Sequence, residues 1–180
     1  MNFMENNIAQ KLQEVKDWLQ KEYAGIRTGQ ASPALLDSVK VESYGSMLPL
    51  NQVGSVGVED ARTLRVSPWD TTLTSAIEKA VQEANLGVSV ATDSGGLRVI
   101  FPELTAERRD QLLKLAKSKL EDARITVRGL RDDAMKEIDA TEKAGDISED
   151  EKFTSKEQLQ KSVDVTNKGL EALFSQKEIE

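Results

Sequence analysis

Cysteine and histidine are both absent from this chain of 180 residues. Without them the protein has no disulfide, no thiol nucleophile and no zinc site built on thiolate or imidazole ligands. Imidazole, the commonest general base of enzymes, is missing for the same reason. A chain without cysteine is compatible with a cytoplasmic location, which we expect for this protein.

Aromatic residues are also scarce, at 4% of the chain. This shortage argues against binding of single-stranded nucleic acid by base stacking. No basic N-terminal region precedes an apolar run, and no window is apolar enough to cross a bilayer, so we expect no membrane partner. The formal net charge is −7, so any RNA binding must come from a local basic patch.

The glycine patterns of P-loops, dinucleotide-binding turns and nucleophile elbows are missing as well. Carboxylates do cluster, at Asp132-Asp133 and Glu149-Asp150-Glu151. These clusters fall on expected helix surfaces or at a helix start, where acidic side chains are usually solvated. We therefore predict no catalytic residue, metal site, cofactor or small-molecule substrate, and we do not expect an enzyme.

A long helical pattern from Thr105 to Lys143 dominates what is present. Its apolar residues recur at steps of three, four or seven: Leu112, Ala116, Ala123, Val127, Leu130, Ala134 and Ile138. These steps place them in one stripe of a helix roughly 60 Å long. Such a helix predicts the spine of a helical bundle.

A second stripe on this helix is basic, and it consists of Lys117, Arg124, Arg128 and Arg131. The structural interpretation is that the stripe is the solvated flank of an amphipathic helix. The functional interpretation is that it is a surface for a partner with regularly spaced negative charge, such as RNA phosphate. Composition and spacing leave both interpretations open.

Two more helices are expected. The first runs roughly from Phe3 to Arg27, with Trp18 at the edge of its apolar stripe. The last follows a capping box at Ser148 and Glu151, and its stripe steps by four and three through Leu159, Val163, Thr166, Leu170 and Leu173. This heptad-like spacing predicts nearly antiparallel packing in a three-helix bundle.

Residues 35–101 change period and favour strands, at Val39–Val41, Val56–Val58 and Leu64–Val66 and in a hairpin around Asp93–Gly96. A short helix is expected over about Ser75–Asn85, with Gly87 as its left-handed cap. Trp69 is a candidate anchor of this small core. Segments 28–33 and 101–105, which contain Pro33 and Pro102, are predicted hinges.

Several motifs resemble those of the bacterial-type ribosome recycling factors. They include RTGQASPALLD from Arg27, PWD from Pro68, LTAERR from Leu104, RGLRD from Arg128 and ISED from Ile147. The matches follow one another in order along nearly the whole chain. The resemblance implies an α+β, L-shaped, two-domain molecule. A small β/α/β domain at residues 30–104 would be inserted into a long antiparallel three-helix bundle of residues 1–29 and 105–180.

The resemblance also implies a function. Such factors act with elongation factor G and GTP on post-termination ribosomes, splitting the subunits and releasing mRNA and deacylated tRNA. They are non-catalytic, and they bind large-subunit rRNA near the peptidyl site; we expect a monomer. The implied rRNA-binding residues are Arg128 and Arg131, with Arg124 and Lys117 of the same stripe, and Arg27. The implied hinge residues are Thr28, Gly29, Ser32, Pro33, Pro102 and Leu104.

Three positions depart from the family pattern: Gln30, Gly129 and Asp132. Asp132 follows Arg128 by four residues, so we expect it to pair with that arginine. The hypothesis is weaker rRNA binding than in a typical member. The main alternative is an adaptor whose stripe binds an acidic protein; it would show neither ribosome association nor dependence on Arg131.

Overall fold

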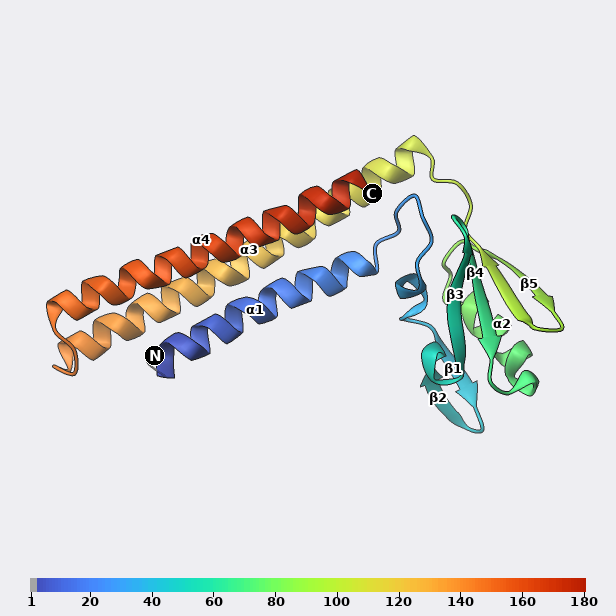
Figure 1. Cartoon of the computed structure of the whole chain (residues 1–180), viewed down its shortest axis with the longest axis horizontal. Helices are drawn as coiled ribbons and strands as arrows, with labels where there is room; N and C mark the ends of the chain where they lie inside the picture. The colour runs from blue at the N-terminus through green and yellow to red at the C-terminus, as the bar shows by residue number, and fades with distance from the viewer. Residues whose placement is uncertain (1–2) are drawn as a thin grey trace. The chain divides into compact units, whose positions relative to one another are not determined.

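The computed structural model describes residues 3–180, which divide into two compact units. One unit contains helix α1 (Phe3–Ala24) up to Tyr23, together with residues Leu113–Ile179. The other contains Ala24–Leu112 and Glu180. Helices α3 (Ala106–Lys143) and α4 (Glu149–Ile179) follow the strands in the chain (Figure 1). The α+β fold class predicted from the sequence is confirmed.

The helical unit is held by apolar stripes and by contacts that fix the direction of its helices. The Tyr23 hydroxyl at the end of α1 donates to the Ala116 carbonyl early in α3, at 2.8 Å. Lys156 of α4 pairs with Asp139 late in α3, at 2.7 Å. Helix α3 is therefore antiparallel to both neighbours (Figure 1). The buried side chains are Leu12, Val15, Leu19, Tyr23, Ala116, Leu120, Ala123, Val127, Ile138, Leu159, Val163 and Leu170.

This core agrees with the predicted stripes, with two differences in α3. Leu120 is buried although the sequence pattern omitted it, while Leu112, Leu130 and Ala134 are only partly buried. In α4, Thr166 and Leu173 of the predicted stripe are likewise only partly buried. Helix α1 ends at Ala24 rather than near Arg27. Gly25 follows directly, and glycine is among the poorest helix formers, which explains the earlier end.

Side-chain caps begin both long helices as the sequence predicts. The Arg108 amide donates to Thr105 Oγ1 at 3.0 Å, and the Glu151 amide donates to Ser148 Oγ at 3.1 Å. Each bond satisfies one amide of the first turn that has no partner within the helix. No helix in residues 3–180 is long and apolar enough to span a bilayer.

The sheet-containing unit has a two-stranded and a four-stranded sheet. Strands β1 (Lys40–Ser43) and β2 (Ser46–Pro49) form a hairpin. The larger sheet is antiparallel throughout, in the order β3 (Gly54–Asp60), β4 (Thr63–Pro68), β6 (Gly96–Ile100), β5 (Ser89–Asp93). Helix α2 (Thr74–Glu83) also contributes to its aliphatic core. That core contains Leu36, Val41, Leu64, Val66, Ile77, Val81, Leu97 and Val99.

Two sequence predictions for this unit are wrong. Trp69 is 68% exposed, not a core anchor. Strand β4 ends at Pro68, so Trp69 lies in the bend that follows it, where the strand no longer directs side chains into the core. The left-handed residue directly after the α2 cap is Asn85, at φ 54°, and Gly87 lies two residues further on at φ 70°. Asparagine tolerates this conformation better than most residues, so it ends the helix first.

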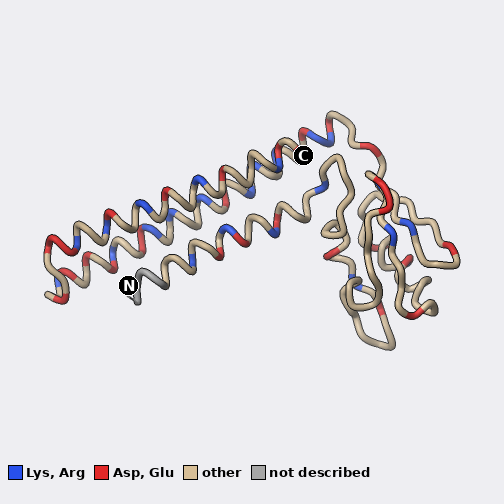
Figure 2. The backbone as a smooth tube through the Cα atoms, in the orientation of Figure 1, with Lys and Arg blue, Asp and Glu red and all other residues tan. Residues whose placement is uncertain are grey.

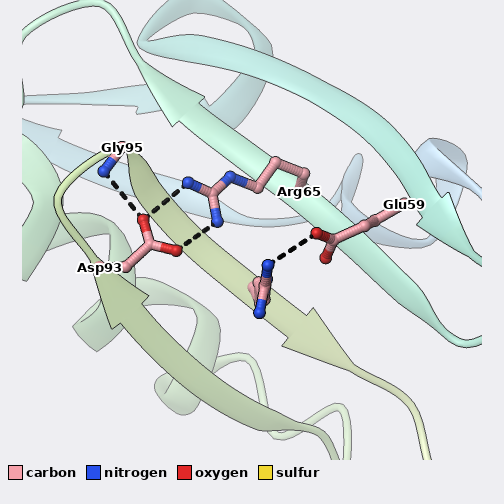
Figure 3. Close-up of polar contacts among 5 residues, drawn as sticks. Glu59, Arg65, Asp93 and Gly95 are labelled. Carbon is pink, nitrogen blue, oxygen red and sulfur yellow. Dashed lines mark hydrogen bonds and ion pairs between the residues drawn. The ribbon is translucent and has the colours of Figure 1, made fainter.

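The face of the sheet opposite the core carries two crossed ion pairs (Figure 3). Register places Arg65 of β4 directly opposite Arg98 of β6. Arg65 makes two 2.6 Å bonds to Asp93 of β5, and Arg98 pairs with Glu59 of β3 at 2.9 Å. Strand β5 thus supplies a carboxylate for Arg65, and strand β3 supplies one for Arg98. These carboxylates offset the repulsion between the two arginines, which face each other across the ladder.

Candidate nucleic-acid interface

Lysine and arginine residues recur along α3 (Figure 2), and two arginines of the basic stripe directly follow buried residues in the chain. Arg124 and Arg128 follow Ala123 and Val127 directly in the chain. Those two small side chains are 0% and 1% exposed, so they fix which side of the helix enters the bundle core. The adjacent arginines are therefore held at its edge, about 100° further around the helix.

Arg128 is the most available arginine of the stripe. Its side chain is exposed, and it has no hydrogen-bond or ion-pair partner within residues 3–180. Lys117 is also exposed and makes no ion pair in that range. A guanidinium is a permanent charge with a planar set of donors that matches two phosphate oxygens. These two side chains can accept an anion without giving up a protein contact.

Arg124, at the edge of the bundle core, is instead bound by carboxylates. Its Nη2 lies 2.8 Å from Glu171 Oε1 on α4, and its Nη1 lies 3.9 Å from Glu121. The sequence does not predict the contact of Arg124 with Glu171, because the two residues are 47 positions apart and only the packing of α4 brings them together. Two carboxylates offset the charge of Arg124, so this residue has less to offer a phosphate than Arg128 has.

Arg131 has a carboxylate partner that the sequence assigned to another arginine. Its Nε and Nη2 lie 3.2 Å and 3.1 Å from Asp132 Oδ1. The predicted pair between Asp132 and Arg128 is not formed. Arg131 is long enough to fold back to its neighbour, and it brings two donors to one oxygen. A phosphate bound at Arg131 would have to compete with this carboxylate.

Arg27 lies in the sheet-containing unit, whereas the other four predicted residues lie in the helical unit. Its guanidinium donates to the Pro102 carbonyl and stands 5.4 Å from the Phe101 ring centroid. Burial, followed by the charges of Arg108 and Arg62, lowers the pKa of Arg27. These contacts give Arg27 a structural role, because they connect the chain that leaves α1 with the chain that leads to α3.

The predicted hinge residues lie in the two segments that connect the units, residues 28–33 and 101–105. Backbone hydrogen bonds join both segments to the turn at Ala61–Arg62. The Ala31 amide donates to the Ala61 carbonyl and the Phe101 amide to the Arg62 carbonyl, both at 2.7 Å. Ser32 is extended, at φ −134° and ψ 152°, as expected before Pro33, which opens a short 3-10 turn. Thr28 and Gly29 precede the first tie, while Pro102 and Leu104 follow the second.

Comparison with known proteins gives this arrangement a family. Residues 19–180 match the family model described as ribosome recycling factor. A ribosome-recycling factor of Chlorobium phaeobacteroides is 45% identical over 170 residues, covering 94% of this chain and 91% of the relative. One of Gluconacetobacter diazotrophicus is 40% identical over 175 residues, covering 97% and 93%.

Solved structures support the same family assignment. The solution structure of a ribosome recycling factor matches with a TM-score of 0.77 and 35% identity, covering 99% of this chain and 96% of that one. A second match, with a TM-score of 0.69 and 34% identity, covers 98% and 96%. It comes from models of the T. thermophilus factor and E. coli elongation factor G bound to the E. coli post-termination complex. Sequence and fold therefore agree along almost the whole chain, which belongs to the ribosome recycling factor family.

Proposed function

We propose that this protein acts on ribosomes after peptide release. Together with elongation factor G and GTP it would split the subunits and free mRNA and deacylated tRNA. Family membership supports this role, as does the related factor described with elongation factor G on a post-termination complex. The proposal includes a monomeric protein that works in the cytoplasm.

The proposed anchor is the basic stripe of α3, set against large-subunit rRNA near the peptidyl site. The observation that carries it is Arg128, an exposed arginine without a partner in the described chain, in a protein whose net charge is −7. Charge that no carboxylate offsets, on an acidic protein, is what a phosphate partner requires. Such contacts position a protein but read no base sequence.

The proposed mechanism is mechanical. Elongation factor G hydrolyses the GTP, and this protein transmits force. The stripe anchors the bundle of residues 1–29 and 105–180, while the partner moves the small domain of residues 30–104. The linkers at Thr28–Gly29 and Pro102–Leu104 would bend, because they lie beyond the backbone bonds of Ala31 and Phe101 to the sheet. The bonds of the Gly29 amide to Glu180 and of Arg27 to Pro102 would open in that motion. Contacts between the ribosomal subunits are then strained until they separate.

Light scattering of post-termination ribosomes, with elongation factor G and GTP present, tests the proposal. The wild-type protein should lower the scattered intensity as the subunits separate. Arg128→Ala and Arg131→Ala should reduce the splitting rate, with the larger loss at Arg128 because it has no competing carboxylate. Lys136→Ala is the matched control, because it removes one exposed charge from α3 outside the stripe.

Each result has a distinct meaning. If the wild type splits ribosomes and both arginine variants are as fast as Lys136→Ala, the function stands and the anchor lies elsewhere. If the wild type fails with a matched elongation factor, the recycling role is wrong for this chain.

A further inference from the structure

Arg27 joins the two linkers of the chain at one point inside the sheet-containing unit. It directly precedes the first linker, and its guanidinium donates to the carbonyl of Pro102 on the second. The same guanidinium stands 5.4 Å from the centroid of the Phe101 ring, a side chain that is only 3% exposed. An aromatic face attracts a cation, so two different attractions hold Arg27 on the second linker. We call these two contacts the linker latch.

Two further arginines of the same unit lie beside the linker latch. The Phe101 amide donates to the carbonyl of Arg62 at 2.7 Å, so Arg62 is a direct neighbour of the residue that Arg27 covers. Arg108 lies in the first turn of α3, which begins at Ala106, shortly after Pro102 in the chain. Both side chains are exposed. The latch therefore brings a third cation to a place that already has two.

The remaining charges of this region are carboxylates, and they do not cancel the repulsion. They belong to Asp60, Glu103, Glu107 and Glu180, and all four residues are exposed. Burial, followed by the charges of Arg108 and Arg62, lowers the pKa of Arg27, so these neighbours disfavour its charged form. Arginine keeps its proton in proteins, and the repulsion therefore weakens the latch. Arg27 Nε is also buried without a hydrogen-bond partner in the described structure, which adds a desolvation penalty.

We propose that the linker latch is an electrostatically loaded joint, in which Arg27 holds the two linkers together while repulsion from Arg62 and Arg108 keeps the contact close to opening. With the latch closed, the linkers move as one element. Opening frees each linker to bend alone and relieves the repulsion in the same step. The inference rests on the proposed function only for what this bending achieves, because the latch belongs to the free protein.

The sign of the salt dependence identifies such a joint. Salt screens the repulsion between exposed like charges, so the latch should close as the salt concentration rises. A latch held by opposite charges would instead open. Raising the salt concentration from about 0.01 M to about 1 M shortens the Debye length from about 30 Å to about 3 Å, which removes most of the repulsion.

The absence of cysteine permits a direct measurement on the full chain. Nitroxide labels on Ser118→Cys of α3 and Gln82→Cys of α2, two exposed positions in different units, report the distance between the units. Pulsed electron paramagnetic resonance gives the distribution of that distance. In the labelled protein without further change, the distribution should narrow as salt is raised, because a closed latch restricts the linkers.

Variants of the labelled protein separate the attraction from the repulsion. Arg27→Met removes both the donors and the charge, so its distribution should be broad at every salt concentration. Arg62→Gln and Arg108→Gln should each narrow the distribution at low salt and reduce its response to salt. Arg109→Gln is the matched control, because it removes the same charge from the same exposed turn of α3 but is not one of the charges that lower the pKa of Arg27.

Three results would overturn the loaded joint. Equal distributions with and without Arg27→Met would mean that Arg27 does not join the linkers. A distribution that broadens with salt would mean that opposite charges hold the latch. Equal narrowing by Arg109→Gln and Arg108→Gln would assign the effect to net charge.

Ribosome splitting distinguishes this inference from the function on which it rests. At saturating protein concentration, where a change in affinity has no effect, Arg27→Met should split post-termination ribosomes more slowly than the wild type. The expected distance distributions with a wild type that does not split ribosomes would refute the recycling role and leave the latch. Splitting by the wild type with the same rate in Arg27→Met would leave the recycling role and refute the part of the latch in it.

Discussion

Arg128 and Arg131 are three residues apart on one helix, yet the structure leaves only Arg128 without a partner in its described part. The difference comes from a single carboxylate, that of Asp132. An exposed ion pair contributes about 0–1 kcal/mol to stability, which is small enough for a phosphate to displace it. Both arginines can therefore bind a phosphate, and Arg128 does so without first giving up an ion pair.

At the scale of single residues, the side chain of Asn167 carries a free-energy penalty. Its Oδ1 is buried and has no hydrogen-bond partner in the described structure. We expect Asn167→Leu to stabilise the protein by about 1–2 kcal/mol, because a buried unpaired carbonyl carries a desolvation penalty. Urea denaturation measures the change. Lys168→Leu, at an exposed position of the same helix, should stay within about 0.5 kcal/mol of the wild type. Loss of stability in Asn167→Leu would mean that the amide makes a bond in solution.

Asp93 makes the stability of the larger sheet depend on pH in the acidic range. Its bonds to Arg65, and then the Gly95 amide, lower the pKa of Asp93 to about 2, from an ordinary value of 3.8 (Figure 3). The unfolded chain takes up this proton at a higher pH than the folded protein does. The stabilisation is therefore present above about pH 4 and is lost as the pH falls toward about 2.

The comparison of wild type with Asp93→Asn measures this contribution. The difference in their free energies of unfolding should be largest near neutral pH and should shrink steadily below about pH 4. A difference that stays constant down to about pH 2 would show that the carboxylate charge is not responsible. Asp122→Asn is the control, because it makes the same substitution at an exposed position of α3.

At the scale of elements, Tyr23 joins α1 to α3. Its ring is 4% exposed, and its hydroxyl donates to the Ala116 carbonyl at 2.8 Å. Burial raises the pKa of Tyr23 to about 12, against a smaller opposing effect from Arg124. The unfolded chain loses this proton near pH 10, before the folded protein does. Stability should therefore fall as the pH rises from about 10 to about 12.

Tyr23→Phe should remove that alkaline loss and cost about 1 kcal/mol near neutral pH for the missing hydrogen bond. Denaturation curves between about pH 8 and 12 provide the measurement. Tyr44, which is 84% exposed, is retained in both proteins and cancels in the comparison. Equal alkaline losses in the two proteins would assign the effect to another group.

At the scale of the whole molecule, the net charge of −7 opposes the approach of RNA while the stripe favours it. Gln30→Arg and Asp132→Arg should each steepen the salt dependence of ribosome binding by about 0.7–0.9 and tighten it at low salt. Asp122→Arg makes the same charge change as Asp132→Arg at an exposed site outside the stripe. If Asp122→Arg has an equal effect, net charge rather than the local patch controls binding.

The amino-acid sequence by itself determined most of the elements and their order, although it did not predict strand β2. Steps of seven and four placed Ala116, Ala123 and Val127 on one helix face, and burial of all three agrees. Thr105 and Ser148 marked two helix starts because their hydroxyl groups have the right spacing to cap. These features depend on neighbours within about one turn, and such interactions can be read along the chain.

Only the tertiary structure decided which charges remain available. Glu171 reaches Arg124 from another helix, and Trp69 is exposed rather than in the core. Arg27 likewise donates a hydrogen bond to the carbonyl of Pro102, 75 residues away, and no local sequence pattern predicts this contact. The pair of Arg131 with its neighbour Asp132 is local, but it depends on side-chain geometry that residue spacing alone does not give. Periodicity fixes the direction of a side chain around its own helix or strand. What that side chain meets depends on where other elements pack, because ion pairs form through space between residues distant in the chain.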